Sequence, residues 1–320
     1  MRATKRRLMG IVLAALVAAS WSGSPAQSQS QSQSQVRDAT GRIVLVTDTS
    51  RVVSIGGAVT EILYALGLGA RIVAVDQTST FPAPARALPN VGYARTLAPE
   101  GVLSAEPTVI LAMEGAGPNS TLEVLKQASV PVVMVPDGHT AEAVIRKIEV
   151  VADAMGVPDR GRQLARAVRA DFEALATAVQ GLPDTRAVFV LSASSGAPVV
   201  GGAGTSADAM LHLAGAANAM ASLAGYKPAV DEAALAADPD AVVVMSDGGQ
   251  KLTADVIFAL PAFQGTAAAR DRRLVALPGS YLLGFGPRTP QAARDLALAL
   301  HPGAALPALP AHPWSGEGTR

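Results

Sequence analysis

Two series of strand patterns, each alternating with helix patterns, constrain the fold of this chain most strongly. Short runs rich in β-branched residues, set between helical patterns of apolar residues, are typical of buried strands. The first series of expected strands covers residues 51–55, 71–75, 108–112 and 130–135, and the second covers residues 187–191, 241–245 and 273–277. Strands that alternate with helices of about ten residues favour βαβ units and a mainly parallel sheet. The sequence therefore predicts an α/β fold with two lobes.

A long helical segment separates the two series. Residues 140–179 have no strand pattern, and their helical pattern is interrupted only at Gly156-Val157-Pro158. The part after this break is rich in alanine and places apolar residues at helical spacing. We therefore expect two Rossmann-like lobes joined by a single long helix. The expected boundaries are an N-terminal lobe at 42–156, a bridging helix at 157–181, a C-terminal lobe at 182–312 and a tail at 313–320.

The N-terminus has the features of a secretion signal. Four basic residues lie within the first seven positions, an apolar run of 12 residues follows at 8–19, and Ser24-Pro25-Ala26 supplies small residues for cleavage. The run is too short to span a bilayer, and the chain has no cysteine for a lipid anchor. We expect a cleaved signal peptide at 1–26, a Gln/Ser-rich tether at 27–41 and a protein free in a periplasm.

Composition and motifs exclude several functions. Removing residues 1–26 leaves 22 of the 26 basic residues against 26 acidic ones, a net charge of −4, and no basic stripe is available for nucleic acid. The absence of cysteine excludes disulfides and thiolate metal sites. The four histidines lack metal-ligand spacing, the glycine pairs at 56–57 and 201–202 do not complete a nucleotide motif, and no nucleophile elbow is present. The sequence therefore does not predict an enzyme.

One segment occurs twice in the chain. Residues 99–113 align without gaps to residues 231–245, and in both copies a short helical pattern is followed by an acidic residue, a proline and a buried strand. Glu100 and Glu232 occupy equivalent positions in the two copies. If the repeat is functional, we expect Glu100 and Glu232 to have equivalent roles in the two lobes. The alternative is that both are solvated carboxylates in a first helical turn, where negative charge is favoured.

A long segment without helix or strand periodicity, residues 76–98, is a candidate binding loop. A stretch of this length inside a compact domain is usually functional. It ends in Asn90-Val-Gly-Tyr-Ala-Arg-Thr-Leu97, and if this piece is extended, Tyr93 and Arg95 share one face. A neighbouring guanidinium favours the phenolate form of tyrosine, and phenolate is a ligand for ferric iron and for haem. The alternative is a loop tyrosine that only packs its ring and hydrogen-bonds its hydroxyl.

The chain resembles the haem-binding periplasmic component of bacterial haem ABC importers, within the helix-bridged class that also contains cobalamin and ferric-siderophore binders. The resemblance covers about residues 51–299. Its most specific part is Gly92-Tyr-Ala-Arg95, followed by Leu97, Pro99-Glu100-Gly101 and Leu103-Ser104; Thr60-Glu61-Ile62, Leu66-Gly67, residues 201–208 and residues 281–288 support it.

The resemblance implies a role for each of four residues. Tyr93 is expected as the axial ligand of ferric haem and Arg95 as its assistant. Glu100 and Glu232 are expected to dock on the two permease subunits, which gives the repeat a reason because equivalent acids can meet equivalent subunits. Arg288, at an expected helix start, is a candidate partner for a haem propionate or else a helix cap.

The resemblance also implies a function. We expect a monomeric periplasmic protein, without enzymatic activity, that captures ferric haem in the cleft between its lobes and delivers it to an ABC permease with its ATPase subunits. Some relatives carry a histidine early in the second lobe, but residues 190–196 contain none, which favours one five-coordinate haem held by Tyr93 alone. A corrinoid or ferric-siderophore carrier on the same fold, and less favoured, a secreted α/β enzyme, are the alternatives.

Overall fold

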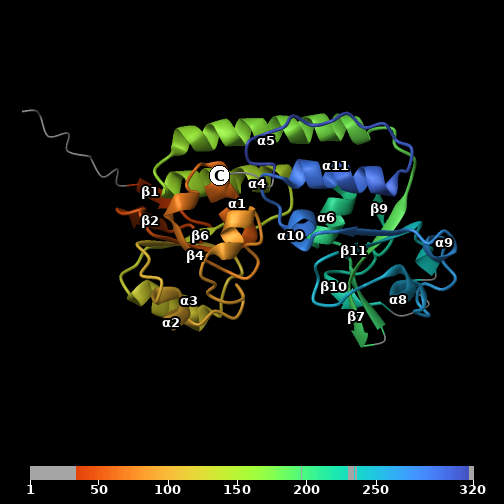
Figure 1. Cartoon of the computed structure of the whole chain (residues 1–320), viewed down its shortest axis with the longest axis horizontal. Helices are drawn as coiled ribbons and strands as arrows, with labels where there is room; N and C mark the ends of the chain where they lie inside the picture. The colour runs from red at the N-terminus through yellow and green to blue at the C-terminus, as the bar shows by residue number, and fades with distance from the viewer. Residues whose placement is uncertain (1–33, 196, 230–233, 235, 317–320) are drawn as a thin grey trace, which may run out of the picture. The chain divides into compact units, whose positions relative to one another are not determined.

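The N-lobe is built around a parallel sheet of four strands in the order β4-β3-β5-β6 (Figure 1). The structure is a computed structural model that describes residues 34–195, 197–229, 234 and 236–316. The strands are β3 (Val52–Ile55), β4 (Ile72–Val75), β5 (Val109–Met113) and β6 (Val132–Val135). Four helices connect and flank them: α1 (Gly57–Ala65), α2 (Pro99–Leu103), α3 (Asn119–Gln127) and α4 (Ala141–Ala154). All four strands are almost completely buried, as expected for a parallel sheet covered on both faces.

The C-lobe contains a mixed sheet in the order β10-β8-β7-β11-β12, with β9 also paired to β7. β7 (Arg186–Ser195), β9 (Ala217–Asn218), β11 (Ala241–Met245) and β12 (Leu274–Leu277) are parallel, whereas β8 (Ala197–Gly201) and β10 (Tyr226–Pro228) add an antiparallel edge. The helices described here are α6 (Ser206–Leu213), α8 (Ala254–Phe258), α9 (Ala267–Arg270), α10 (Gly279–Leu283) and α11 (Thr289–Leu300). The two-lobed α/β fold expected from the alternating pattern is confirmed.

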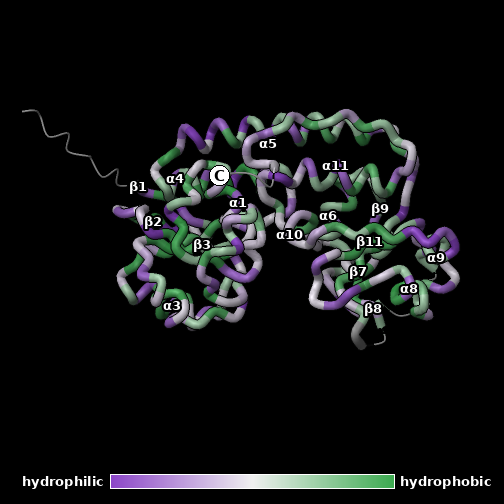
Figure 2. Tube along the Cα trace, viewed as in Figure 1, coloured by the Kyte–Doolittle hydropathy of each residue, from purple (hydrophilic) through white to green (hydrophobic). Residues whose placement is uncertain are grey.

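The long helix α5 (Pro158–Val179) runs along both lobes (Figure 1). It buries Leu164, Val168, Phe172 and Leu175, the apolar positions that follow helical spacing in the sequence. Helices α4 and α11 pack against it, and one continuous hydrophobic cluster contains residues from both sheets and from α5. Figure 2 shows the strands of both lobes as mainly hydrophobic. The lobes therefore share a packed core in addition to the helix that links them.

The expected tether is wrong from Ser34 onward. β1 (Ser34–Arg37) pairs in antiparallel register with β2 (Ile43–Val46), and the side chains of Val36 and Val46 are buried. The Asp38 carboxylate accepts hydrogen bonds from the backbone N–H groups of Thr40 (2.9 Å) and Arg42 (3.1 Å) and so fixes the turn between the strands. The side chains of Val36 and Val46 join the hydrophobic core of the N-lobe, and their burial stabilises the hairpin. The expected signal peptide lies outside the described residues.

The C-terminal segment also departs from expectation. Trp314, in the expected tail, packs against the hydrophobic core, and its ring stacks on that of His312 at a centroid distance of 4.2 Å. The imidazole of His312 in turn lies 2.8 Å from the buried Asp171 carboxylate on α5. The chain is therefore anchored beyond residue 312. Among the helices of the described part of the chain, none combines the length and hydropathy needed to cross a bilayer.

Candidate functional site

A cavity of about 720 Å³ lies between the two lobes, where the carboxyl ends of both sheets face each other. Ligands of parallel α/β sheets bind at this edge, beyond the strand ends where the strand order reverses. In the N-lobe the lining residues follow the four strands: Gly56 and Gly57 after β3, Gln77 and Thr78 after β4, Met113 to Ala116 at the end of β5, and Asp137 and His139 after β6. In the C-lobe, Met245 ends β11, Asp247 and Gly248 follow it, and Gly279 and Ser280 follow β12. The topology thus assembles the cavity from short segments after the strands.

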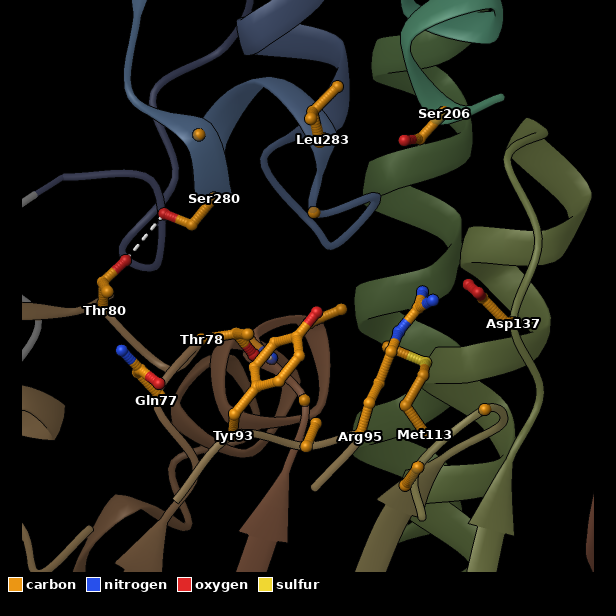
Figure 3. A pocket seen from close by; sticks show the side chains of 18 of the residues that line it. Gln77, Thr78, Thr80, Tyr93, Arg95, Met113, Asp137, Ser206, Ser280 and Leu283 are labelled. Atoms are coloured by element: carbon orange, nitrogen blue, oxygen red, sulfur yellow. Dashed lines mark hydrogen bonds between the residues drawn. The ribbon is translucent and has the colours of Figure 1, made fainter. Parts of the chain in front are cut away.

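Tyr93 and Arg95 both line this cavity, and a tight turn presents them (Figure 3). The sequence analysis assumed an extended segment, whereas the backbone N–H of Thr96 donates to the carbonyl of Tyr93 (2.9 Å), which closes a turn. Gly92, at φ +99°, supplies the left-handed conformation that enters it. Figure 3 nevertheless shows both side chains pointing into the cavity. The expected pairing is present, but its geometric cause is a turn and not strand alternation.

Backbone hydrogen bonds fix this turn on both sides. On one side, Gln77 N–H donates to the carbonyl of Gly92 (2.9 Å), which ties the turn to the end of β4. On the other side, the N–H of Gly117 donates to the carbonyl of Ala94 at 2.9 Å. The carbonyl of Gly117 accepts from the N–H of Leu97, also at 2.9 Å. Tyr93 is therefore carried by a rigid support although 43 % of its surface is exposed.

A buried polar network anchors the start of the candidate loop. Asp76, with 1 % of its surface exposed, accepts hydrogen bonds from Gly56 N–H (2.9 Å), Thr78 N–H (3.0 Å) and the Ser79 hydroxyl (2.7 Å). The Thr78 hydroxyl oxygen in turn accepts from Gly57 N–H at 2.9 Å. Two N–H groups at the start of α1, those of Gly56 and Gly57, are thus satisfied by side chains. Gly56-Gly57 therefore does not present them to a phosphate.

Carboxylates outnumber cations on the cavity walls. Glu114, Asp137 and Asp247 line it, and Arg95 is the only arginine or lysine among the lining residues. Lys147 lies behind this wall: its completely buried ammonium is 3.4 Å from Asp137 Oδ1 and donates to the carbonyls of Gly138 (3.0 Å) and Phe285 (3.3 Å). Burial lowers the pKa of Lys147, and the Asp137 carboxylate opposes this change. Arg95 is thus the cation that a ligand in the cavity can reach.

The internal repeat is visible in the backbone. Glu106 and Asp238 occupy matching positions, and both have left-handed backbones, at φ 49° and φ 36°. Met113 and Met245 end the matching strands β5 and β11, and both line the cavity. Neither methionine was predicted as a cavity residue; the alignment of residues 99–113 with 231–245 was the signal that could have placed both at the strand ends. Glu100 is exposed in the first turn of α2, whereas Glu232 lies outside the described residues.

Arg288 is not among the residues that line the cavity, and its expected contact with a haem propionate stays a prediction. Its guanidinium donates to both carboxylate oxygens of Glu61, from Nη2 to Oε1 at 2.6 Å and from Nε to Oε2 at 3.0 Å. The guanidinium carbon also lies 3.3 Å from the ring centroid of Phe81. The Arg288 guanidinium is thus the counter-charge of a buried carboxylate on the other lobe.

His139 is the histidine that lines the cavity. Its ring contacts Phe285 edge-on, with centroids 5.0 Å apart, and burial lowers its pKa. A search of the described residues for three or more clustered histidine, cysteine, aspartate or glutamate side chains found none that could hold a metal ion. Tyr93 and Arg95 thus bring a phenol and a guanidinium to the same cavity.

Comparisons with known proteins agree with this architecture. Residues 52–281 match the periplasmic binding protein family. The solved structure of the periplasmic heme-binding protein RhuT from Roseiflexus sp. RS-1, in apo form, is 37 % identical with a TM-score of 0.76, and the match covers 81 % of this chain and 100 % of that one. The periplasmic heme-binding protein BhuT in complex with two hemes is 40 % identical with a TM-score of 0.75, over 80 % of this chain and 99 % of that one.

A vitamin B12-binding protein from Vibrio parahaemolyticus is 29 % identical over 205 residues, which are 62 % of this chain and 73 % of the relative. These relatives are all named as binding proteins and differ in what they bind. The family match extends over more than two thirds of the chain and includes the strands and loops that form the cavity. The chain therefore belongs to the periplasmic binding protein family.

Proposed function

We propose that this protein captures ferric haem in the cavity between its lobes and delivers it to an inner-membrane ABC permease. The observation that carries the proposal is the position of Tyr93: its phenol is held on a rigid turn, enters the cavity and lies beside Arg95. A phenolate oxygen is an axial ligand for ferric haem. The 37 % and 40 % identity to two heme-binding proteins supports the same cargo.

The composition of the walls suits a flat ligand with two acidic groups. Glycines from both lobes and alanines from the N-lobe, together with Met113, Met245 and Leu283, give small or apolar surfaces on which a macrocycle can lie. Glu114, Asp137 and Asp247 repel carboxylates, so the propionates of haem would be directed toward Arg95 or toward solvent. No step of this process needs covalent chemistry from the protein.

Delivery requires a permease with its ATPase subunits as partner. Of the two residues proposed to dock on it, Glu100 and Glu232, Glu100 lies in the described part of the chain. Its side chain is exposed in the first turn of α2, at the end of the N-lobe that lies away from α5 (Figure 1). Secretion through a cleaved signal peptide at 1–26 would place the monomer in the periplasm, where such a permease is accessible.

The test is a titration of the purified mature protein with haemin, followed by absorbance. The wild type should give a shifted Soret band and a ferric–phenolate charge-transfer band, and Tyr93→Phe should lose the charge-transfer band that its phenolate produces. Tyr64→Phe is the matched control because Tyr64 is partly buried and is not among the cavity residues. Wild-type spectra identical to those of free haemin would refute haem as the cargo.

A corrinoid is the second candidate cargo, since a relative 29 % identical over 205 residues is a vitamin B12-binding protein. In that case Tyr93 would stack or hydrogen-bond and would not ligate a metal. A ferric siderophore is a further possibility on the same fold. The protein should be titrated in parallel with haemin, cyanocobalamin and a ferric siderophore while its intrinsic tryptophan fluorescence is followed. The cargo is the compound that quenches this fluorescence in a saturable way.

A further inference from the structure

The cavity is lined by two acidic side chains without a counter-charge, one from each lobe. Glu114 comes directly after β5 in the N-lobe, and Asp247 comes shortly after β11 in the C-lobe. Both residues are exposed, and neither forms an ion pair with any residue that the structure describes. The third acid, Asp137, differs because the Lys147 ammonium lies 3.4 Å from its Oδ1 atom. Glu114 and Asp247 are therefore the uncompensated negative charges of the described walls.

The same kind of hydrogen bond holds both carboxylates. A proline follows each neighbouring strand, β6 and β12, and the next residue donates its backbone N–H: Asp137 to Glu114 Oε2 at 2.9 Å, and Gly279 to Asp247 Oδ1 at 2.6 Å. When the internal repeat is continued, Glu114 matches Ser246, so Asp247 stands one position later. Glutamate is longer than aspartate by one methylene group, which compensates for this offset. The two lobes thus place a carboxylate at corresponding points of their walls.

Nothing else on the C-lobe wall offsets these charges. Its other polar side chains among the described residues are neutral: Ser206, Tyr226 and Ser280. The hydroxyl oxygens of Ser206 and Tyr226 lie 2.9 Å apart and satisfy each other. Arg95 is on the N-lobe wall beside Tyr93 (Figure 3). A cleft whose walls carry mainly one sign of charge focuses the electric field, so the cavity repels the carboxylates of a ligand except near Arg95.

We propose that Glu114 and Asp247 select iron porphyrins by the placement of their carboxylates, so that the protein accepts haem and rejects iron coproporphyrin. The inference rests on the proposed function and names the class of porphyrin that the site takes. Haem carries its propionates on neighbouring pyrrole rings, so it can turn them toward Arg95 or solvent and keep its apolar edge at the two acids. Coproporphyrin carries a propionate on every pyrrole ring, so no rotation of its macrocycle keeps carboxylates away from Glu114 and Asp247.

The experiment compares the Kd values of haemin and iron coproporphyrin III by absorbance titration. The wild type should bind haemin at least about tenfold more tightly. The double variant Glu114→Gln/Asp247→Asn should narrow this preference several-fold by binding iron coproporphyrin III more tightly. Glutamine and asparagine keep a carbonyl oxygen for the N–H groups of Asp137 and Gly279, so the walls retain their shape.

The matched control is Glu173→Gln/Asp184→Asn, which changes the net charge equally at exposed acids outside the cavity. It should keep the wild-type preference. Circular dichroism verifies that each variant is folded. A measurement on the wild type alone gives the same test without a variant: raising the ionic strength should narrow its preference for haemin, because salt screens charges that are open to solvent.

Three results would overturn this selection while leaving haem as the cargo. The first is equal affinity of the wild type for the two porphyrins, and the second is an unchanged preference in Glu114→Gln/Asp247→Asn. The third is an equal narrowing in Glu173→Gln/Asp184→Asn, which would assign the preference to the net charge of the protein and not to the cavity acids. Absence of saturable haemin binding by the wild type would instead refute the proposed function. The failures of the two proposals are thus separate observations.

Discussion

Glu61 on α1 and Arg288 at the start of α11 form a two-point ion pair that links the N-lobe to the C-lobe. The two hydrogen bonds measure 2.6 Å and 3.0 Å, and only 7 % of the Glu61 side chain and 11 % of the Arg288 side chain are exposed. Thr80 and Ser280 add a second link, with their hydroxyl oxygens 2.8 Å apart. The contacts lie beside the cavity, so they hold the two walls in a defined relation.

Removal of one partner of this ion pair should destabilise the protein strongly. Arg288→Ala leaves the Glu61 carboxylate buried without a counter-charge, and a loss of this kind costs about 3–5 kcal/mol of the free energy of unfolding. Urea denaturation followed by circular dichroism measures it. The control is Arg162→Ala, because the Arg162–Asp159 pair is exposed and such pairs contribute about 0–1 kcal/mol. Equal effects of the two substitutions would contradict a structural role for Arg288.

Arg95 should strengthen haem binding through its charge. Arg95→Ala removes the one arginine that lines the cavity, and we expect haemin affinity to fall about tenfold, the equivalent of about 1.4 kcal/mol. Arg95→Lys keeps a positive charge and should recover part of the affinity. Absorbance titrations of the three proteins measure the differences. If Arg95→Lys and Arg95→Ala bound haemin equally weakly, the shape of the guanidinium and not its charge would be responsible.

The sequence predicted the fold well because the relevant signals are local. β-Branched runs marked the strands, and the apolar spacing at Leu164, Val168, Phe172 and Leu175 marked the long helix. The hairpin β1–β2 was missed because the Gln/Ser alternation that precedes it suggested an unstructured tether up to residue 41. The hairpin is marked only by Val36, which is buried, and by the turn at Asp38. These features cover few residues and come directly after the alternation of Gln and Ser.

The site was only partly predictable. Tyr93 and Arg95 lie close together in the sequence, so a motif could identify them. The Glu61–Arg288 pair joins residues 227 positions apart, and the Tyr226–Ser206 contact depends on how an edge strand meets a helix. No local pattern reports such contacts, which explains why the pairing of Arg288 with Glu61 was not predicted.

Gly202 should not tolerate a side chain. A Cβ at this position would collide with the carbonyl oxygen of Leu223, in a turn held by hydrogen bonds from Gly202 N–H to Gly225 O (3.0 Å) and from Ala203 N–H to Leu223 O (2.7 Å). Gly202→Ala is expected to cost about 1–3 kcal/mol of stability. Gly249→Ala is the matched control, since no atom lies within 4 Å of the added Cβ, and should stay within about 0.5 kcal/mol of the wild type.

His301 should make stability depend on pH. The side chain is buried, with 5 % of the residue exposed, and burial followed by the charge of Arg273 lowers its pKa from 6.5. Below pH 6.5 the unfolded chain therefore binds a proton at this histidine that the folded chain does not, so stability falls as the pH drops from 6.5 toward the lowered value. Urea unfolding on both sides of this range should show a smaller loss for His301→Gln than for the wild type. An identical loss in the two proteins would mean that His301 does not contribute to the pH dependence.

Glu100 should matter for delivery and not for haem capture. Its carboxylate is exposed on α2, and it is absent from the residues that line the cavity. If it docks on a basic pocket of the permease, Glu100→Gln should lower haem uptake into proteoliposomes that contain the cognate permease and its ATPase by about tenfold or more, as expected when one member of an interfacial charge pair is lost. Haemin affinity of the isolated protein should not change. Glu173→Gln is the matched control because Glu173 is exposed on α5, the long helix that runs along both lobes, and is not among the cavity residues. Unchanged uptake with Glu100→Gln, at subsaturating carrier, would exclude this carboxylate from the docking surface.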